Sequence, residues 1–172
     1  MTLEAIFLKP ITLCLVQMGN KGLELVTAYP KVLPKKVLDE LTYKSMPMSA
    51  KPGDFSSGSI GDLFYSSYIF QLPQEDVRHN IGAIIAVFED MKYNLEGIKK
   101  TFSCIIKELD GKSLLKLDII QEILPNLYTG FVKGVINIKI SSIATISIKF
   151  NDMESSEEEK DYTEDLEEDL WR

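Results

Sequence analysis

The sequence predicts an α+β fold in which five antiparallel strands form one sheet, with one short helix on one side and two helices on the other. Three observations lead to this prediction. Strand-like segments occur in a group of two and a group of three, short loops join the members of each group, and a helix separates the groups. The 172 residues, 45% hydrophobic and 26% charged, suit one globular domain. We assign it to residues 1–150 and expect residues 151–172 to form a disordered acidic tail.

The first predicted element is a β-hairpin. Residues 11–18 are almost entirely apolar, which is typical of a strand covered on both faces. Gly19, Asn20 and Gly22 then favour the positive φ angles of a tight turn. Residues 23–29 form a second extended segment, so the two segments should pair antiparallel.

A short amphipathic helix should follow the hairpin. Pro34 stands where the first turn of a helix tolerates proline, and the helix should stop near Pro47. Its apolar face is formed by Val37, Leu38 and Leu41.

Three further strands are predicted with unequal strength. Residues 49–62, rich in Ser, Gly and Asp, are expected to form a loop or at most a broken edge strand around Phe55. The aromatic and β-branched residues of 63–72 favour a strand. A polar turn at 73–80 joins it to residues 81–88, the most apolar strand of the chain, which should lie in the middle of the sheet.

Two consecutive helices should cover one face of this sheet. Asn94 can cap the first helix and Asp110-Gly111 should end it. Ser113 should open the second helix, with a kink at Pro125. Their apolar positions keep helical spacing: Ile98, Phe102, Ile105, Ile106 and Leu109 in the first, and Leu114, Leu117, Ile120, Ile123, Leu124, Leu127 and Phe131 in the second.

Residues 135–150 have apolar side chains at the even positions except Ser142, and mostly polar ones at the odd positions, which is the period of a half-buried strand. One strand of this length would span about 53 Å at ~3.3 Å per residue, so we expect two strands or a sharp bend at Ser141-Ser142. The apolar face must be buried against the core or against another chain, which makes a homodimer one expectation. Its isoleucines are therefore candidate partner contacts: Ile136, Ile138, Ile140, Ile146 and Ile148.

The formal net charge of −7 is unevenly distributed. Residues 151–172 hold 11 of the 26 Asp and Glu residues and two of the 19 Lys and Arg residues, a net charge of −9. Residues 1–150 therefore carry 15 acids and 17 bases, a net charge of +2. The tail can act as a solvating segment, or Leu166, Leu170 and Trp171 can form a short motif that folds on a basic groove.

Composition argues against several classes of function. Of the 19 basic residues only Arg78 and Arg172 are arginines, so bidentate recognition of nucleic acid has few donors. One histidine and two distant cysteines cannot build a zinc site, and we expect no cofactor. Cys14 and Cys104 lie in apolar stretches, as free thiols do in a reducing compartment. No apolar run reaches the roughly 18 residues of a membrane span, so we expect a cytoplasmic protein with at most peripheral membrane contact.

No catalytic constellation stands out, and we expect a protein that is not an enzyme. His79 is the only histidine and lies in a polar turn, where solvation is its ordinary role. The loop at 53–62 has glycines and serines that could cradle an anion, yet Asp54 and Asp62 repel phosphate.

The order of elements resembles the longin fold, which occurs in trafficking adaptors, vesicle-fusion proteins and complexes that act on small GTPases. The hairpin from Cys14 to Val26 and the strand from Ile81 to Glu89, leading into two helices, are the parts that look similar. The resemblance covers roughly residues 5–132. It implies a non-catalytic interaction module that binds a small GTPase or a partner subunit of a trafficking or regulatory complex. The alternative is a profilin-like small-ligand sensor or enzyme that uses the loop at 53–62.

Overall fold

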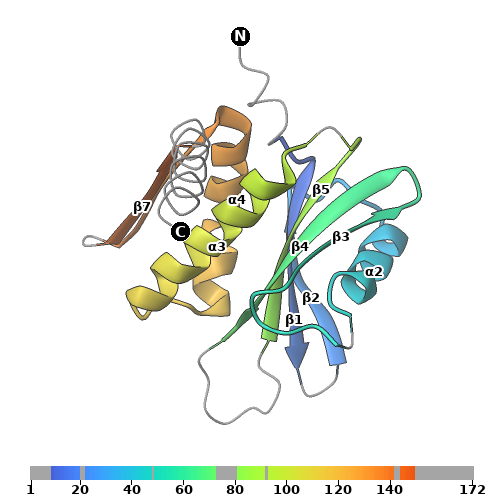
Figure 1. Cartoon of the computed structure of the whole chain (residues 1–172), viewed down its shortest axis with the longest axis horizontal. Coiled ribbons are helices and arrows are strands. Elements are labelled where there is room, and N and C mark those ends of the chain that lie inside the picture. The colour runs from blue at the N-terminus through green and yellow to red at the C-terminus, as the bar shows by residue number, and fades with distance from the viewer. Residues whose placement is uncertain are drawn as a thin grey trace, which may run out of the picture.

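The computed structural model describes residues 9–19, 22–47, 49–72, 81–91, 93–141 and 144–149, with side chains described as far as residue 134. Five strands form one antiparallel sheet in the spatial order β2-β1-β5-β4-β3 (Figure 1). Their bounds are Thr12–Gly19 for β1, Gly22–Tyr29 for β2, Phe55–Ile60 for β3, Leu63–Gln71 for β4 and Ile81–Phe88 for β5. The most apolar strand, β5, is thus central, as the sequence predicts.

Helices cover both faces of the sheet. Helix α2 (Lys35–Lys44) lies on one face, and α3 (Leu95–Gly111) and α4 (Leu117–Lys133) lie together on the other (Figure 1). This confirms the predicted α+β architecture, with one short helix opposite two longer ones.

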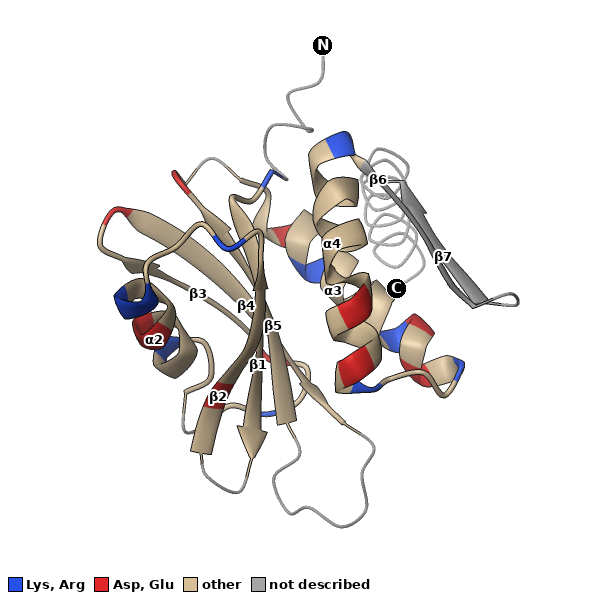
Figure 2. Ribbon diagram, turned by 180° about the vertical axis from the view of Figure 1, so that it is seen from behind, with Lys and Arg blue, Asp and Glu red and all other residues tan. Residues whose placement is uncertain are grey.

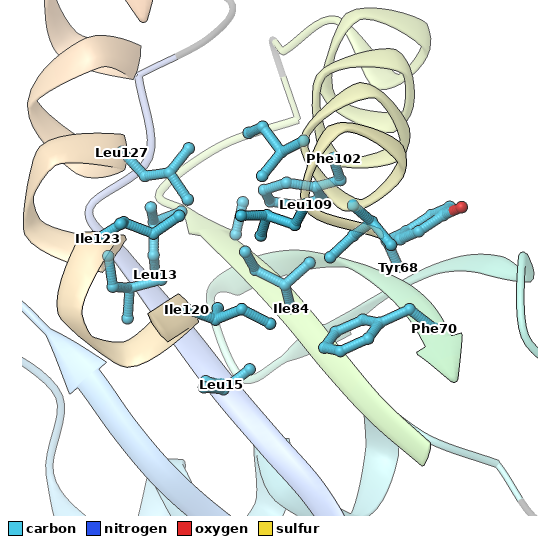
Figure 3. Packing of buried hydrophobic residues seen from close by; sticks show 14 of the residues in the cluster. Leu13, Leu15, Tyr68, Phe70, Ile84, Phe102, Leu109, Ile120, Ile123 and Leu127 are labelled. Atoms are coloured by element: carbon cyan, nitrogen blue, oxygen red, sulfur yellow. The ribbon is translucent and has the colours of Figure 1, made fainter. Parts of the chain in front are cut away.

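Each face of the sheet has its own hydrophobic core, because alternate residues of a strand point to opposite faces. On β1, Leu13 and Leu15 pack toward α3 and α4, whereas Cys14 and Val16 pack toward α2. Figure 3 shows the larger core, where Leu13 and Ile84 of the sheet meet side chains of both long helices. All the apolar positions predicted for the first long helix are buried. Each fully buried side chain contributes about 1.5–3 kcal/mol.

The aromatic residues of this core pack at specific angles. The rings of Phe102 on α3 and Phe131 on α4 lie 5.7 Å apart between centroids at 76°, an edge-to-face contact that joins the two helices. A similar contact, 5.9 Å and 75°, joins Tyr29 of β2 to Tyr128 of α4. Helix α4 is therefore fixed both to α3 and to the edge of the sheet.

The structure refines one sequence prediction and corrects another. The Ser/Gly-rich segment, expected to be a loop or at most a broken edge strand around Phe55, forms the six-residue edge strand β3. Helix α4 begins at Leu117, not at Ser113, and extends to Lys133 with Pro125 inside it. The kink expected at Pro125 stays a prediction. Ser113 has a positive φ of 59° and ends the preceding helix instead of opening the next.

Ser113 closes a Schellman motif at the end of α3. Its N–H donates to Asp110 O at 3.1 Å, and Leu114 N–H donates to Leu109 O at 2.7 Å, which is the six-to-one bond of that motif. Gly111 is the last helical residue, so the left-handed position comes two residues after the expected stop.

A second, two-stranded sheet follows α4. Strands β6 (Val135–Ser141) and β7 (Ala144–Lys149) pair antiparallel, with Ile136 opposite Ile148 and Ile138 opposite Ile146. Strand β6 contacts α4, and β7 lies beside α3. Among the described helices, none combines the length and the apolar character that a membrane crossing demands.

Candidate functional site

The partner contacts predicted from the sequence fall only partly within the described structure. The isoleucines at 136, 138, 140, 146 and 148 lie on the paired strands β6 and β7, where the backbone alone is described. Leu166, Leu170, Trp171 and His79 lie outside the described residues. The candidate sites below are formed by described side chains.

The two aspartates of the Ser/Gly-rich segment do not share a site. The Asp54 carboxylate accepts the N–H of Lys51 at 2.8 Å and so stabilises a local turn before β3. Asp62 follows Gly61 in the turn between β3 and β4, where Gly61 has a φ of 58°. The eight residue steps between the two aspartates span roughly 26 Å in an extended strand, too far for one small ligand.

The middle of the same segment does line a groove. This groove, of about 280 Å³, lies between the edge strand β3 and the connection from β5 to α3. We call it the β3 groove, and its described lining is Ser57, Gly58, Ser59, Phe64, Met91, Tyr93 and Leu95. None of these residues carries a charge.

Two large apolar side chains border the β3 groove in contact with solvent. Met91 is 73% exposed and Leu95 is 44% exposed, which places both among the most exposed large hydrophobic residues described. Large exposed apolar side chains that gather at one groove favour an interaction surface more than isolated ones do.

The floor of the groove is held by a chain of hydroxyl groups. The Ser57 and Ser66 Oγ atoms lie 3.0 Å apart, and Ser66 Oγ donates to Tyr93 Oη at 3.3 Å. The Tyr93 ring stacks on Phe88, with 3.9 Å between centroids and 7° between planes. This stacking fixes Tyr93 against the sheet and keeps its hydroxyl near the serines.

Strand β3 is the last strand of the sheet, so one of its backbone edges is not paired within the sheet. Ile69 N–H donates to Asp54 O at 2.9 Å, and Gly53 N–H donates to Ile69 O at 2.7 Å, so the Asp54 carbonyl points toward β4. Successive residues of an antiparallel strand direct their N–H and C=O groups to alternate sides, so those of Phe55, Ser57 and Ser59 point away from β4. The β3 groove thus lies beside an open strand edge.

Lys44 of α2 covers one end of this edge. Its Nζ donates to the outward-facing Ser59 O at 3.4 Å. Lysine at a sheet edge discourages unspecific pairing with other strands. The outward groups of Phe55 and Ser57 receive no hydrogen bond from another described residue.

The two cysteines have shifted pKa values that fit structural roles. Burial raises the pKa of the Cys14 thiol to about 12, against a smaller opposing effect of a hydrogen bond with Thr12. Burial is also the largest cause that raises the pKa of Cys104. A reactive cysteine needs a lowered pKa, so neither thiol is activated as a nucleophile. Both are free, as predicted, although Cys104 is only partly buried. The described residues form no cluster of three or more potential metal ligands.

The chain was compared with models of known protein families and with curated protein sequences. Neither comparison found a match.

Sequence reasoning did not identify the β3 groove. Its one signal is a pair of large apolar residues, Met91 and Leu95, on either side of the predicted cap Asn94. The cap itself is confirmed, since the Asn94 side chain accepts the N–H of Gly97 at 3.0 Å. The groove depends on how the start of α3 lies relative to β3, which no local pattern encodes.

Proposed function

We propose that this chain is a non-catalytic protein–protein interaction module, similar to the longin domains of vesicle-trafficking and GTPase-regulating complexes. It binds a small GTPase or a partner subunit through the β3 groove and the neighbouring edge of β3. The observation that supports this most directly is the exposure of Met91 and Leu95 beside an open strand edge.

The architecture supports the same proposal. The longin resemblance implies a hairpin, a short helix, three strands and two helices, and the described elements follow that order from β1 to α4. The single helix and the helix pair lie on opposite faces of the sheet, as the resemblance also implies (Figure 1). The fold alone does not decide a function, because one fold hosts many.

The chemistry of the groove favours recognition of a protein segment. Its described lining offers hydroxyl, thioether, aromatic and aliphatic groups. A strand edge supplies backbone hydrogen bonds to an extended peptide, and adjacent apolar side chains add specificity. A partner segment that pairs with Ser57 would place an apolar side chain next to Met91 and Leu95.

The test is binding of the full chain to a panel of small GTPases, each loaded with GDP or with a nonhydrolysable GTP analogue. The substitutions Met91→Asp and Leu95→Asp together should weaken binding at least tenfold. The matched control carries Val32→Asp and Tyr43→Asp, two exposed apolar residues near and on α2, and should bind normally. Absence of binding to every GTPase in both nucleotide states would contradict the GTPase proposal.

A small-ligand sensor is the second candidate, because three hydroxyls converge at the groove floor. Thermal-shift screening of the full chain tests it. A ligand that raises the melting temperature of the wild type, but not of a Ser57→Ala/Tyr93→Phe variant, would favour this candidate. Loss of the shift in an Asp54→Asn/Asp62→Asn variant would instead support ligand binding by these two aspartates, as the sequence-based alternative expects.

A further inference from the structure

A groove with polar sides runs along α3, apart from the β3 groove. It has a volume of about 540 Å³, and its described lining comes from one helix. We call it the α3 stripe, formed by Glu96, Lys99, Lys100, Ser103, Cys104, Lys107 and Glu108. These residues recur every three to four positions, so they lie along one side of the helix.

The described lining of the α3 stripe holds three lysines and two glutamates, a net charge of +1. Lys99, Lys100 and Lys107 line it, whereas the Glu108 carboxylate is bound by Lys112 Nζ at 2.6 Å. Glu96 lies in the first turn, where the helix dipole stabilises a carboxylate. Figure 2 shows the basic and acidic positions on α3 and the neighbouring elements.

The centre of the stripe is apolar. Cys104 is partly buried and packs against the main hydrophobic core. Glu108 and Lys107 line the same groove as Cys104. Burial and the Glu108 carboxylate raise the pKa of the Cys104 thiol, and Lys107 opposes them. The stripe therefore combines a short apolar centre with flanking ammonium groups, the complement of an acidic segment with apolar anchors.

We propose that the acidic C-terminal tail, residues 151–172, docks on the α3 stripe of its own chain. Two observations select this occupant. The tail has a net charge of −9, opposite to that of the lysines on the stripe. Strand β7, which ends at Lys149 and precedes the tail, contacts α3, so the tail is tethered on the side of the molecule that carries this helix.

The length of the tail is sufficient for docking at any point on the stripe. The 16 residues from 150 to 165 can extend roughly 53 Å, whereas the 17 residues of α3 span roughly 25 Å. Leu166, Leu170 and Trp171 are the apolar anchors, with acidic residues between and before them. In this arrangement the anchors cover Cys104 and the carboxylates face Lys99, Lys100 and Lys107.

Weak contacts are enough for this docking. A short tether gives an intramolecular site an effective concentration on the order of 1 mM. A dissociation constant near 1 mM would then keep the tail bound about half of the time. Ion pairs at the surface are screened by salt, with a Debye length of about 10 Å at 0.1 M and about 3 Å at 1 M. The docked state should consequently be sensitive to ionic strength.

Two native residues report on docking in the full chain. Trp171 is the only tryptophan, so intrinsic tryptophan fluorescence observes the tail alone. Cys104 is the accessible thiol, because Cys14 is fully buried. Docking for about half of the time predicts a blue-shifted Trp171 emission at low salt and roughly twofold slower alkylation of Cys104 by uncharged N-ethylmaleimide than in 1 M NaCl.

The decisive variant reverses the stripe, with Lys99→Glu, Lys100→Glu and Lys107→Glu. Its Trp171 emission should match that of solvent-exposed tryptophan already at low salt. The matched control, Lys31→Glu, Lys35→Glu and Lys36→Glu, makes the same charge change before and on α2, on the other face of the sheet. This control should retain the blue-shifted emission of the wild type.

Several outcomes would overturn the proposal. One is a solvent-like Trp171 emission in the wild type at low salt, and another is an equal effect of both triple variants, which would indicate general electrostatics. Emission that depends on protein concentration would assign the tail to another copy. If the stripe variant fails to fold, the salt dependence of the wild type still decides. No partner is present in this test, so its outcome is independent of the GTPase proposal.

Discussion

The Tyr65 ring lies against the backbone of Gly58 on the neighbouring strand. The two residues are direct partners across β3 and β4, and a Cβ atom on Gly58 would lie 2.8 Å from the Tyr65 hydroxyl oxygen and 2.9 Å from two ring carbons. Tyr65 is buried, and its hydroxyl donates to Lys44 O at 3.2 Å, so the ring cannot easily move away. The glycine that makes this segment look like a loop is therefore what lets it form an edge strand.

Replacement of Gly58 by alanine should lower the free energy of unfolding by about 1–3 kcal/mol, because the new methyl group overpacks against Tyr65. Chemical denaturation measures this loss. Gly19→Ala is the matched control, since a Cβ there meets no atom within 4 Å, and it should change stability by less than about 0.5 kcal/mol. In a Tyr65→Ala background the cost of Gly58→Ala should disappear; a cost that persists would mean that the ring is not its cause.

Ser113→Gly should stabilise the protein. Ser113 holds the left-handed position of the Schellman motif with a φ of 59°, which costs an L-residue about 1–2 kcal/mol. Glycine removes this strain but adds roughly 0.5–1 kcal/mol of backbone entropy to the unfolded chain, so a net gain of about 0.5–1 kcal/mol is expected. The shift in melting temperature checks it. Ser113→Ala keeps the strain and should show no gain; equal stabilisation by alanine would argue against backbone strain.

These two positions illustrate where sequence patterns suffice and where they fail. The hairpin of β1 and β2, the central β5 and the apolar faces of α3 and α4 follow from periodicity, because burial imposes a local repeat. The strand character of β3 does not follow, since Gly58 and its serine neighbours have low β-propensity and are held by pairing with β4. At β3, pairing with β4 outweighs the local sequence preference.

The surface that we propose as functional is less predictable from the sequence than the fold. Met91 and Leu95 would be assigned to the core from hydrophobicity alone, yet both remain exposed because the sheet ends at β3. The Cys104 thiol, in contrast, lies at the boundary between the core and the α3 stripe. The sequence alone does not distinguish this position from a fully buried one. The exposure of a side chain depends on how several elements pack together, so the periodicity of one helix does not predict it.

Stability should fall at alkaline pH because of Cys14. Its pKa is raised to about 12 in the folded state from 9.0, so the folded state retains a proton that the unfolded state loses. The stabilisation is fully present below pH 9 and is lost as the pH rises toward 12, by about 1.4 kcal/mol per pH unit. Urea denaturation of the wild type and of Cys14→Ala between pH 8 and pH 10.5 measures the difference. Parallel pH profiles for the two proteins would show that Cys14 does not ionise on unfolding.

The hydroxyl chain under the β3 groove should be energetically coupled. Ser66 is fully buried and contacts the hydroxyls of both Ser57 and Tyr93, so Ser66→Ala should cost about 1–2 kcal/mol of unfolding free energy. Tyr93→Phe removes the other end of the Ser66–Tyr93 bond. A double-mutant cycle with the two substitutions should give a coupling of about 0.5–1.5 kcal/mol.

A neighbouring serine supplies the control for this cycle. Ser56 Oγ is buried and has no hydrogen-bond partner among the described residues, so Ser56→Ala removes an unsatisfied polar group and should be neutral or slightly stabilising. The two serines lie on the adjacent strands β3 and β4, and each substitution removes the same atom. If Ser66→Ala were as harmless as Ser56→Ala, the hydroxyl chain would not hold Tyr93 in place, and the floor of the β3 groove would depend on the stacking of Tyr93 on Phe88 alone.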